Sequence, residues 1–236
     1  MSSTPAYTST TRPLDALAAG IVVVLCLSWG FNQVATKLAI HDIPPLTQAA
    51  IRSFVAAVLI AAWCRLRGIP LFNHDGTLWC GLAAGALFAI EFILIYQGLL
   101  YTTATRAVLF IYLAPFFVVI GARFVLPADW FGPAQWLGLG MSFAGMLIAF
   151  GLPTPALDPR QHLGDAMMVG GALFWAATTL TIKASALTRA SAEKVMLYQL
   201  VVSGPIMTIT AFVIGERMTN MPSALAIGSM VYQTIW

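Results

Sequence analysis

Long apolar runs, each about as long as a membrane-crossing helix, follow one another along almost the whole chain. A helix needs roughly 20 residues to cross about 30 Å of hydrocarbon. On that measure the sequence predicts seven full spans and one partial span, at residues 15–40, 45–67, 76–98, 102–126, 130–151, 163–187, 192–214 and 222–236. Proline, glycine and threonine between the runs supply the expected helix starts and stops. The predicted fold class is therefore all-α, a polytopic transmembrane helix bundle.

The first run carries polar residues along one face of its predicted helix. Helical spacing puts five residues on that face, namely Trp29, Asn32, Gln33, Thr36 and Lys37. The opposite face is apolar and suits lipid. A polar face at membrane depth instead needs protein or a water-filled cavity against it. This face is therefore a candidate lining of an interior site.

A similar pattern returns in the second half of the chain, where Trp175 and Lys183 keep the spacing of Trp29 and Lys37. A shift of 146 residues aligns both pairs, and the second copy begins five spans after the first. An odd number of crossings reverses the direction of the second copy, so the pattern predicts an inverted repeat. Inverted repeats are typical of secondary transporters. The alternative interpretation is a loose alignment of two apolar helices.

Composition and charge exclude several classes of protein. Hydrophobic residues make up 59% of the chain and charged residues 9%, with a mean hydropathy of +0.85, which favours a membrane protein. The net charge is +3, and no basic patch is interleaved with exposed aromatic residues, so no nucleic-acid partner is expected. The three cysteines are scattered in or beside apolar runs and are interpreted as packing thiols. Neither a metal site nor a cofactor is predicted.

Basic residues near the ends of the spans predict the orientation of the chain. Seven of them fall on the side of the N-terminus: Arg12, Arg65, Arg67, Arg123, Lys183, Arg189 and Lys194. The other five are Arg160 and Arg217 in loops and Lys37, Arg52 and Arg106 within spans. By the positive-inside rule the N-terminus is then cytoplasmic. The first apolar run is too long for a signal-peptide core and is interpreted as an uncleaved span. The expected location is the cell inner membrane, which the chain crosses several times.

The last apolar run stops at Trp236 without a capping residue. A helix that ends within hydrocarbon leaves its last carbonyl groups without hydrogen-bond partners. The sequence is therefore expected to be a piece of a longer protein, truncated within the eighth helix.

Four segments resemble the EamA domain of the drug/metabolite transporter superfamily. They are S-W-G-F-N-Q-V-A-T-K-L-A at 28–39, D-I-P-P-L-T-Q-A-A-I-R at 42–52, G-D-A-M-M-V-G-G-A-L-F-W-A at 164–176 and G-E at 215–216. The resemblance implies ten helices in two inverted five-helix repeats, with cytoplasmic termini and a central substrate cavity. Residues 1–151 then form the first repeat and residues 152–236 an incomplete second repeat. About seven and a half helices of that fold are present.

Polar and aromatic residues of four spans are the candidates for the cavity lining: Trp29, Asn32, Gln33, Glu91, Trp175, Thr178 and Tyr232. Glu91 is the one acidic residue predicted deep within a span, and Arg52 lies at matching depth in the neighbouring span. The two are therefore a candidate buried ion pair. Such a pair would hold two helices together, or Glu91 would serve as a substrate or proton site, and both interpretations stay open.

Two further basic residues, Lys37 and Arg106, are placed nearer the outer boundary of the membrane. Their side chains are expected to extend to the interface, or to form an electropositive vestibule for a solute with a carboxylate. Pro115 and the segment 203–205 are predicted helix kinks of the kind that transporters use as hinges or ligand contacts.

Motifs for enzyme chemistry are missing from the sequence. Neither H-E-x-x-H nor G-x-x-x-x-G-K-[ST] occurs, and the three histidines fall in loops or at helix ends. We therefore expect no enzyme but a secondary transporter that exports a small metabolite, such as an amino acid, by alternating access. The alternative function is a non-transporting membrane scaffold or assembly subunit. The expected partners are a small-molecule substrate and the lipid bilayer, with a homodimer kept open.

Overall fold

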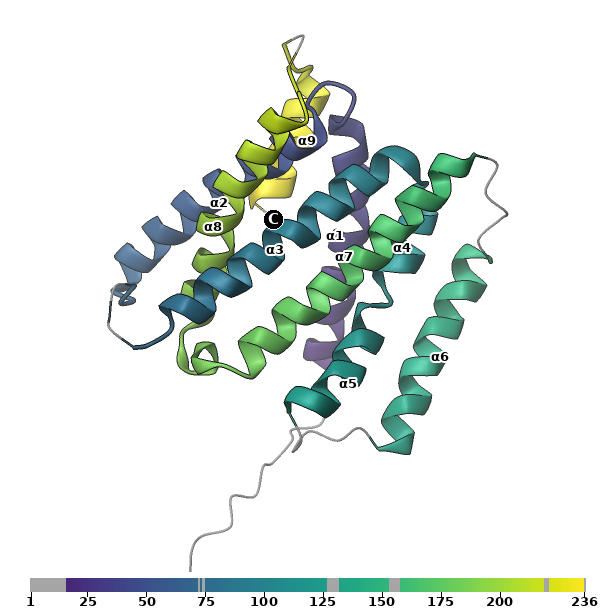
Figure 1. The fold of residues 1–236 in the computed structure, drawn as a ribbon, viewed down its shortest axis with the longest axis horizontal. Coiled ribbons are helices and arrows are strands. Elements are labelled where there is room, and N and C mark those ends of the chain that lie inside the picture. The colour runs from purple at the N-terminus through teal and green to yellow at the C-terminus, as the bar shows by residue number, and fades with distance from the viewer. Residues whose placement is uncertain are drawn as a thin grey trace, which may run out of the picture.

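The chain forms a bundle of helices that cross the molecule alternately in opposite directions (Figure 1). The computed structural model describes residues 16–71, 73, 75–126, 132–152, 158–218 and 221–235. Its helices are α1 Ala16–Ala39, α2 Pro45–Arg67, α3 Leu78–Tyr101, α4 Ala104–Ile111, α5 Ala114–Val125, α6 Pro133–Phe150, α7 Pro159–Lys183, η1 Ala186–Arg189, α8 Ala192–Val213 and α9 Ala224–Ile235. No strand occurs among the described residues, so the all-α prediction is confirmed.

Five helical stretches of the described chain are long and apolar enough to cross a membrane. They are Pro45–Arg67, Leu78–Tyr101, Ala104–Val125, Pro159–Lys183 and Ala192–Val213. The helices lie within four residues of the predicted spans at each end. The largest difference is in α7, which begins at Pro159 where the prediction began at 163. A polytopic helix bundle is therefore the fold, as predicted.

Local sequence sets the helix ends. Pro45 occupies the first turn of α2, where its missing N–H group leaves no hydrogen bond unmade. Gly68 ends α2 in the left-handed region, at a φ of 68°. The backbone nitrogen of Ile69 then donates to the carbonyl oxygen of Cys64 at 2.9 Å, which satisfies one of the last carbonyls of the helix. These ends agree with the sequence because proline and glycine act on the helix in which they lie.

The fourth predicted span is broken into two helices. The α4 helix ends at Ile111 and α5 begins at Ala114. Pro115 has no backbone N–H group to donate to the Ile111 carbonyl, and its ring disfavours a continuous helix. The predicted kink at Pro115 is thus a complete break. Pro205, in contrast, lies inside the uninterrupted helix α8.

Helices from the two halves of the chain interleave. The α3 helix packs against α7 and α8, and α9 packs against α1 and α2. The α2 and α8 helices lie side by side and run in opposite directions (Figure 1). Gly164 permits close contact between α7 and α3, since a Cβ atom there would lie 2.8 Å from the backbone nitrogen of Thr102.

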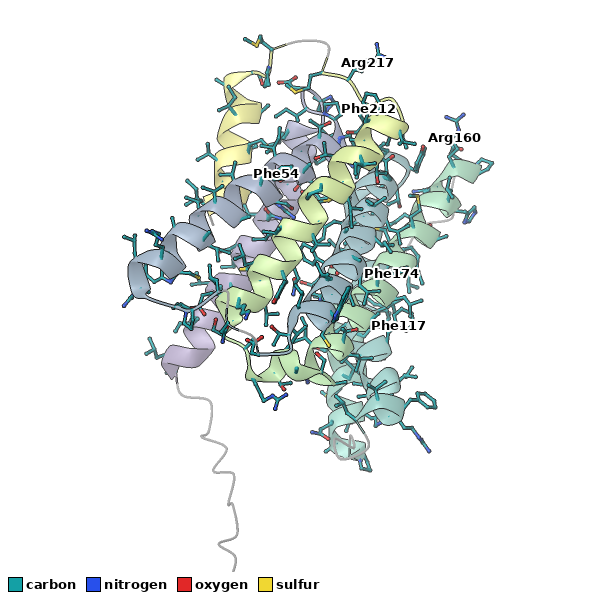
Figure 2. The ribbon with its side chains drawn as sticks, turned by 60° about the vertical axis from the view of Figure 1, so that its left-hand side comes forward. Phe54, Phe117, Arg160, Phe174, Phe212 and Arg217 are labelled. Carbon is teal, nitrogen blue, oxygen red and sulfur yellow. The ribbon has the colours of Figure 1, made fainter. Side chains whose placement is uncertain are left out.

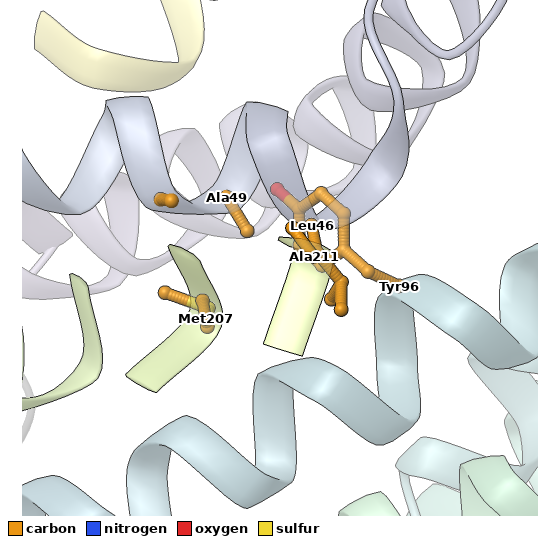
Figure 3. Packing of buried hydrophobic residues seen from close by; sticks show 6 residues of the cluster. Leu46, Ala49, Tyr96, Met207 and Ala211 are labelled. Atoms are coloured by element: carbon orange, nitrogen blue, oxygen red, sulfur yellow. The ribbon is translucent and has the colours of Figure 1, made fainter. Parts of the chain in front are cut away.

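A buried cluster joins α2, α3 and α8 (Figure 3). Its members are Leu46, Ala49, Ala50, Tyr96, Met207 and Ala211. The small alanine side chains let α2 and α8 approach, and the Tyr96 ring fills the space between them and α3. Large apolar side chains on the outside of the bundle, such as Leu66 and Phe212, are exposed. Lipid would cover such a surface, in keeping with a membrane protein.

Candidate substrate site

The α1 and α9 helices bring two of the cavity candidates onto neighbouring elements. Tyr232 of α9 donates a hydrogen bond from its hydroxyl to the carbonyl oxygen of Ser28 in α1, at 3.0 Å. The Tyr232 ring also meets the Phe31 ring edge to face, with centroids 5.0 Å apart. Asn32 lies one residue further along α1 and is half-buried. The side chains of the candidates Trp29 and Gln33, also in α1, lie outside the described residues.

A buried group of polar side chains lies where α1, α2, α3 and α9 meet. We call this group, which consists of Thr36, Gln48, Tyr96 and Gln233, the polar junction. The hydroxyl of Thr36 lies 3.1 Å from Oε1 of Gln233, and the Tyr96 hydroxyl lies 3.5 Å from the same oxygen. Nε2 of Gln48 donates to the Thr36 carbonyl oxygen at 3.5 Å. Gln233 therefore links α9 to α1 and α3, and Gln48 joins α2 to the group through the Thr36 carbonyl oxygen.

Two atoms of the polar junction lack a hydrogen-bond partner within the described part of the chain. They are Oε1 of Gln48 and Nε2 of Gln233. Gln48 is fully buried and Gln233 is 8% exposed. Buried polar atoms in native proteins almost always have a partner, so two unpaired atoms in one group need an explanation. Neither residue is among the cavity candidates predicted from the sequence, because a single glutamine in an apolar run is a weak signal.

Arg52 and Glu91 do not form the direct ion pair suggested by their matched depth. Among the described residues the ion pairs are Arg106–Asp165 and Lys194–Asp75. The Arg52 guanidinium instead lies over the rings of Phe92 and Tyr96, 4.7 Å and 5.7 Å from their centroids. Glu91 is 5% exposed, and it lies near enough to Arg52 for the two charges to interact without a contact of ion-pair length.

Trp175 and Thr178 lie on α7, on the other side of α3. Trp175 packs against the apolar cluster of Ile111, Ala114 and Ala172, which joins α7 to α4 and α5. Thr178 is buried, and its hydroxyl donates to the carbonyl oxygen of Phe174 at 2.9 Å. The candidates thus form two groups, one on α1 and α9 and one on α7.

Arg106 does not extend to the membrane interface, which corrects the prediction of a snorkelling side chain. It is 7% exposed and pairs with Asp165 of α7, and the Thr102 hydroxyl donates to the same carboxylate at 2.7 Å. Asp165 is not among the predicted site residues, because the helix was predicted to begin at residue 163 and Asp165 then lies at its end. The pair Asp158–Pro159 was the available signal, since Asp158 caps the helix and Pro159 occupies its first turn.

An open groove of about 640 Å³ lies along α3, α7 and the end of α8. Its walls are mainly apolar, and Gln97 and Glu216 form its polar part. None of the described cavity candidates lines this groove. Within the described ranges, no three His, Cys, Asp or Glu side chains gather in a way that could hold a metal ion.

Comparison with known proteins defines the class. Residues 16–151 match the family described as "EamA-like transporter family". This match agrees with the five helices of the described chain that are long and apolar enough to cross a membrane. The chain belongs to the EamA-like transporter family. This membership groups it with proteins described as transporters.

Three relatives are described as transporters whose function is uncharacterized. YoaV of Bacillus subtilis (strain 168) is 24% identical over 155 residues, which cover 65% of this chain and 53% of YoaV. A transporter of Archaeoglobus fulgidus is 26% identical over 163 residues, 68% of this chain and 55% of the relative. The inner membrane transporter YedA of Escherichia coli (strain K12) is 22% identical over 224 residues, 89% of this chain and 67% of YedA. The chain thus spans about half the length of the first two.

A solved crystal structure has the same fold. It superposes with a TM-score of 0.70 over 89% of this chain and 70% of the other chain, at 19% identity. At that identity the likeness concerns the fold alone.

Proposed function

We propose that this protein is an inner-membrane secondary transporter that exports small metabolites such as amino acids by alternating access. The observation that carries the proposal is the exchange of helices between the two halves of the chain. The α3 helix of the first half packs against α7 and α8, while α9 of the second half packs against α1 and α2. This arrangement is the one expected of two inverted repeats, which rock against each other around a shared site.

Contacts at opposite ends of the α2–α8 pair support the same proposal. At one end Lys194, near the start of α8, donates to the Asp75 carboxylate in the loop that follows α2, at 2.7 Å. At the other end Glu216, which follows α8, accepts hydrogen bonds from Leu46 and Thr47 at the start of α2. The loop after α2 therefore contacts the first turn of α8, and the loop after α8 contacts the first turn of α2. Such paired contacts suit a structure whose two ends open in turn.

The proposed cavity is lined by the polar and aromatic candidates, Trp29, Asn32, Gln33, Glu91, Trp175, Thr178 and Tyr232. Aromatic and amide side chains suit a solute that has an apolar part and a few polar groups. We propose that the two repeats correspond to residues 1–151 and 152–236. Glu91 then offers a buried carboxyl group to the substrate or to a coupling proton.

The proposed orientation has a cytoplasmic N-terminus. Arg65, Arg67 and Lys194 lie near helix ends that the alternating crossings assign to the N-terminal side, and Figure 2 shows Arg160 and Arg217 together at one end of the bundle. A reporter that is active only in the cytoplasm, fused to the N-terminus, tests this orientation. Loss of the reporter signal, together with activity of a periplasmic reporter, would contradict it. A homodimer stays a prediction that cross-linking in the membrane can test.

Transport itself is tested with the full-length protein in lipid vesicles and a panel of radiolabelled amino acids. The proposal expects saturable counterflow of at least one amino acid and none in protein-free vesicles. A non-transporting scaffold or assembly subunit would give no saturable flux for any solute. The family match favours the transporter over that alternative.

A further inference from the structure

We propose that the polar junction, together with Arg52, is a binding site for a solute that carries a carboxylate and a hydrogen-bond donor, such as an α-amino acid. This inference rests on the proposed transport function and deepens it by assigning the groups that recognise the solute. The junction connects helices from both halves of the chain, α1, α2 and α3 from the first and α9 from the second.

The first observation is the pair of buried amides with unpaired atoms. Gln48 offers an unpaired acceptor, Oε1, and Gln233 offers an unpaired donor, Nε2. Both residues are more than nine-tenths buried. A buried donor and a buried acceptor without partners are unfavourable unless another molecule pairs with them. Between them the amides can satisfy a ligand that presents one acceptor and one donor.

The second observation is how Gln233 is held. The Thr36 and Tyr96 hydroxyls both lie within hydrogen-bond distance of its Oε1. The Thr36 hydroxyl has one hydrogen, which it shares between this oxygen and the Asn32 carbonyl oxygen at 2.9 Å, and the Tyr96 hydroxyl is the second contact. Both contacts are on Oε1, so the N–H groups of Nε2 are left for a further acceptor. The donor is therefore oriented before any ligand binds.

The third observation is the position of Arg52. It follows Gln48 by four residues on α2, so the two side chains share one face of that helix. The guanidinium lies over the ring of Tyr96, whose hydroxyl reaches Gln233. Glu91 lies near enough to interact with the Arg52 charge, but no carboxylate among the described residues comes within ion-pair distance of Arg52. A guanidinium held by aromatic rings keeps its N–H donors for an anion.

These groups define the class of ligand by their chemistry. Arg52 and Nε2 of Gln233 are donors that match the two oxygens of a carboxylate. Oε1 of Gln48 is an acceptor that matches an ammonium or amide N–H group. An α-amino acid carries both groups on one carbon atom. The aromatic rings of Phe92 and Tyr96 flank the guanidinium and provide an apolar wall beside it.

Three probes separate the contributions of the two ends of the ligand. L-leucine carries both groups, leucinamide lacks the carboxylate, and 4-methylpentanoate lacks the ammonium. Binding of each to the purified full-length protein is measured by titration calorimetry in detergent. The variants are Arg52→Met, Gln233→Glu and Gln48→Met, and the control is Gln199→Met, which removes an amide from α8 outside the junction. Size-exclusion chromatography establishes that each variant is folded, and Gln233→Asn replaces Gln233→Glu if the latter is not.

We expect the Arg52 and Gln233 variants to bind L-leucine at least about tenfold more weakly than the wild type. In Arg52→Met the preference for L-leucine over leucinamide should disappear. In Gln48→Met the preference for L-leucine over 4-methylpentanoate should disappear, while affinity for 4-methylpentanoate is kept. The control variant should bind all three probes as the wild type does.

Wild-type affinity for L-leucine in both glutamine variants would overturn the site, and would indicate amides that pair only with buried water. A wild type that binds none of the probes would overturn the ligand class. Vesicle transport separates this inference from the proposed function. Normal amino-acid flux in all three junction variants would remove the site and leave the transporter, whereas no flux in the wild type would remove the proposed function.

Discussion

Glu216 accepts two hydrogen bonds from Thr47, one from the backbone nitrogen at 2.9 Å and one from the hydroxyl at 3.0 Å, although 169 positions separate them in sequence. The other carboxylate oxygen accepts from the Leu46 nitrogen at 3.0 Å and from Gln97 at 3.1 Å. A carboxylate at the N-terminus of a helix satisfies free N–H groups and interacts favourably with the helix dipole. A residue that follows α8 therefore caps α2.

Removing this cap should destabilise the protein. Glu216→Ala is expected to lower the free energy of unfolding by about 1–2 kcal/mol, since it leaves two backbone N–H groups of α2 unpaired. Denaturant unfolding in detergent, followed by circular dichroism, measures the change. Arg217→Ala alters the exposed neighbour and should leave stability unchanged. Equal stability of Glu216→Ala and wild type would show that water replaces the carboxylate without loss.

The buried Arg106–Asp165 pair predicts strong coupling between two helices. Arg106→Gln or Asp165→Asn alone should destabilise the protein by about 3–5 kcal/mol, because each leaves a buried charge without its partner. The double variant should be more stable than either single variant. A double-mutant cycle on unfolding free energies measures the coupling. Additive single effects would mean that the two side chains act independently.

The Asp75–Lys194 contact predicts a dependence of stability on acid pH. Hydrogen bonds from Lys194 and Thr77 hold the pKa of the Asp75 carboxyl well below its usual range. A lowered pKa in the folded state stabilises the protein above the usual value of about 3.9, and the stabilisation is lost as the pH falls below it. The melting temperature of the wild type should therefore exceed that of Asp75→Asn at pH 7, and the gap should shrink between about pH 4 and pH 3. A gap that stays constant over this range would argue against the contact.

Replacing Glu91 is expected to change transport without changing the stability of the fold. Because Arg52 does not form a direct ion pair with it, Glu91→Gln should leave the protein folded, and adding Arg52→Gln should not restore stability. If Glu91 serves the substrate or a coupling proton, Glu91→Gln abolishes transport in vesicles. Glu193→Gln, at the start of α8, is the control and should transport normally. Full transport by Glu91→Gln would assign Glu91 to packing alone.

The two groups of cavity candidates can be tested by chemical access. In a variant without Cys26, Cys64 and Cys80, a cysteine at Asn32 or Trp175 should react with a water-soluble thiol reagent, and a transported amino acid should slow the reaction. Cysteines at Val34 and Leu173 serve as controls, since these exposed apolar residues should face lipid and stay unreactive. Protection of both candidate positions, with labelling of the controls, would contradict a shared cavity.

Helix positions could be read from the sequence because they depend on local properties. Apolar length, together with proline and glycine at the boundaries, predicted α2 at the residues where it is found. Pro115 likewise marked the interruption between α4 and α5, since a missing N–H group acts on its own helix. The largest error of extent is in α7, which was predicted at residues 163–187 and spans Pro159–Lys183. At its start, the capping residue Asp158 was interpreted as part of a loop.

Side-chain contacts between different helices could not be predicted from local sequence. Depth along two spans suggested Arg52 and Glu91 as a pair, but depth does not fix the direction in which each side chain leaves its helix. In the structure the Arg52 guanidinium packs over the rings of Phe92 and Tyr96 instead. Arg106 forms an ion pair with Asp165 of α7. The sequence did not predict this pair, because the predicted helix began at residue 163 and so placed Asp165 outside the membrane interior.

The sequence by itself determined that this is a helical membrane protein and placed its helices to within about four residues, since lipid requires each apolar segment to satisfy its own backbone. It also carried the family resemblance that the comparisons confirmed. Only the tertiary structure decided that Glu216 caps α2 and that Gln48 and Gln233 meet at one junction. Those contacts depend on how distant helices turn and pack against each other, and a single polar residue in an apolar run does not encode its partner.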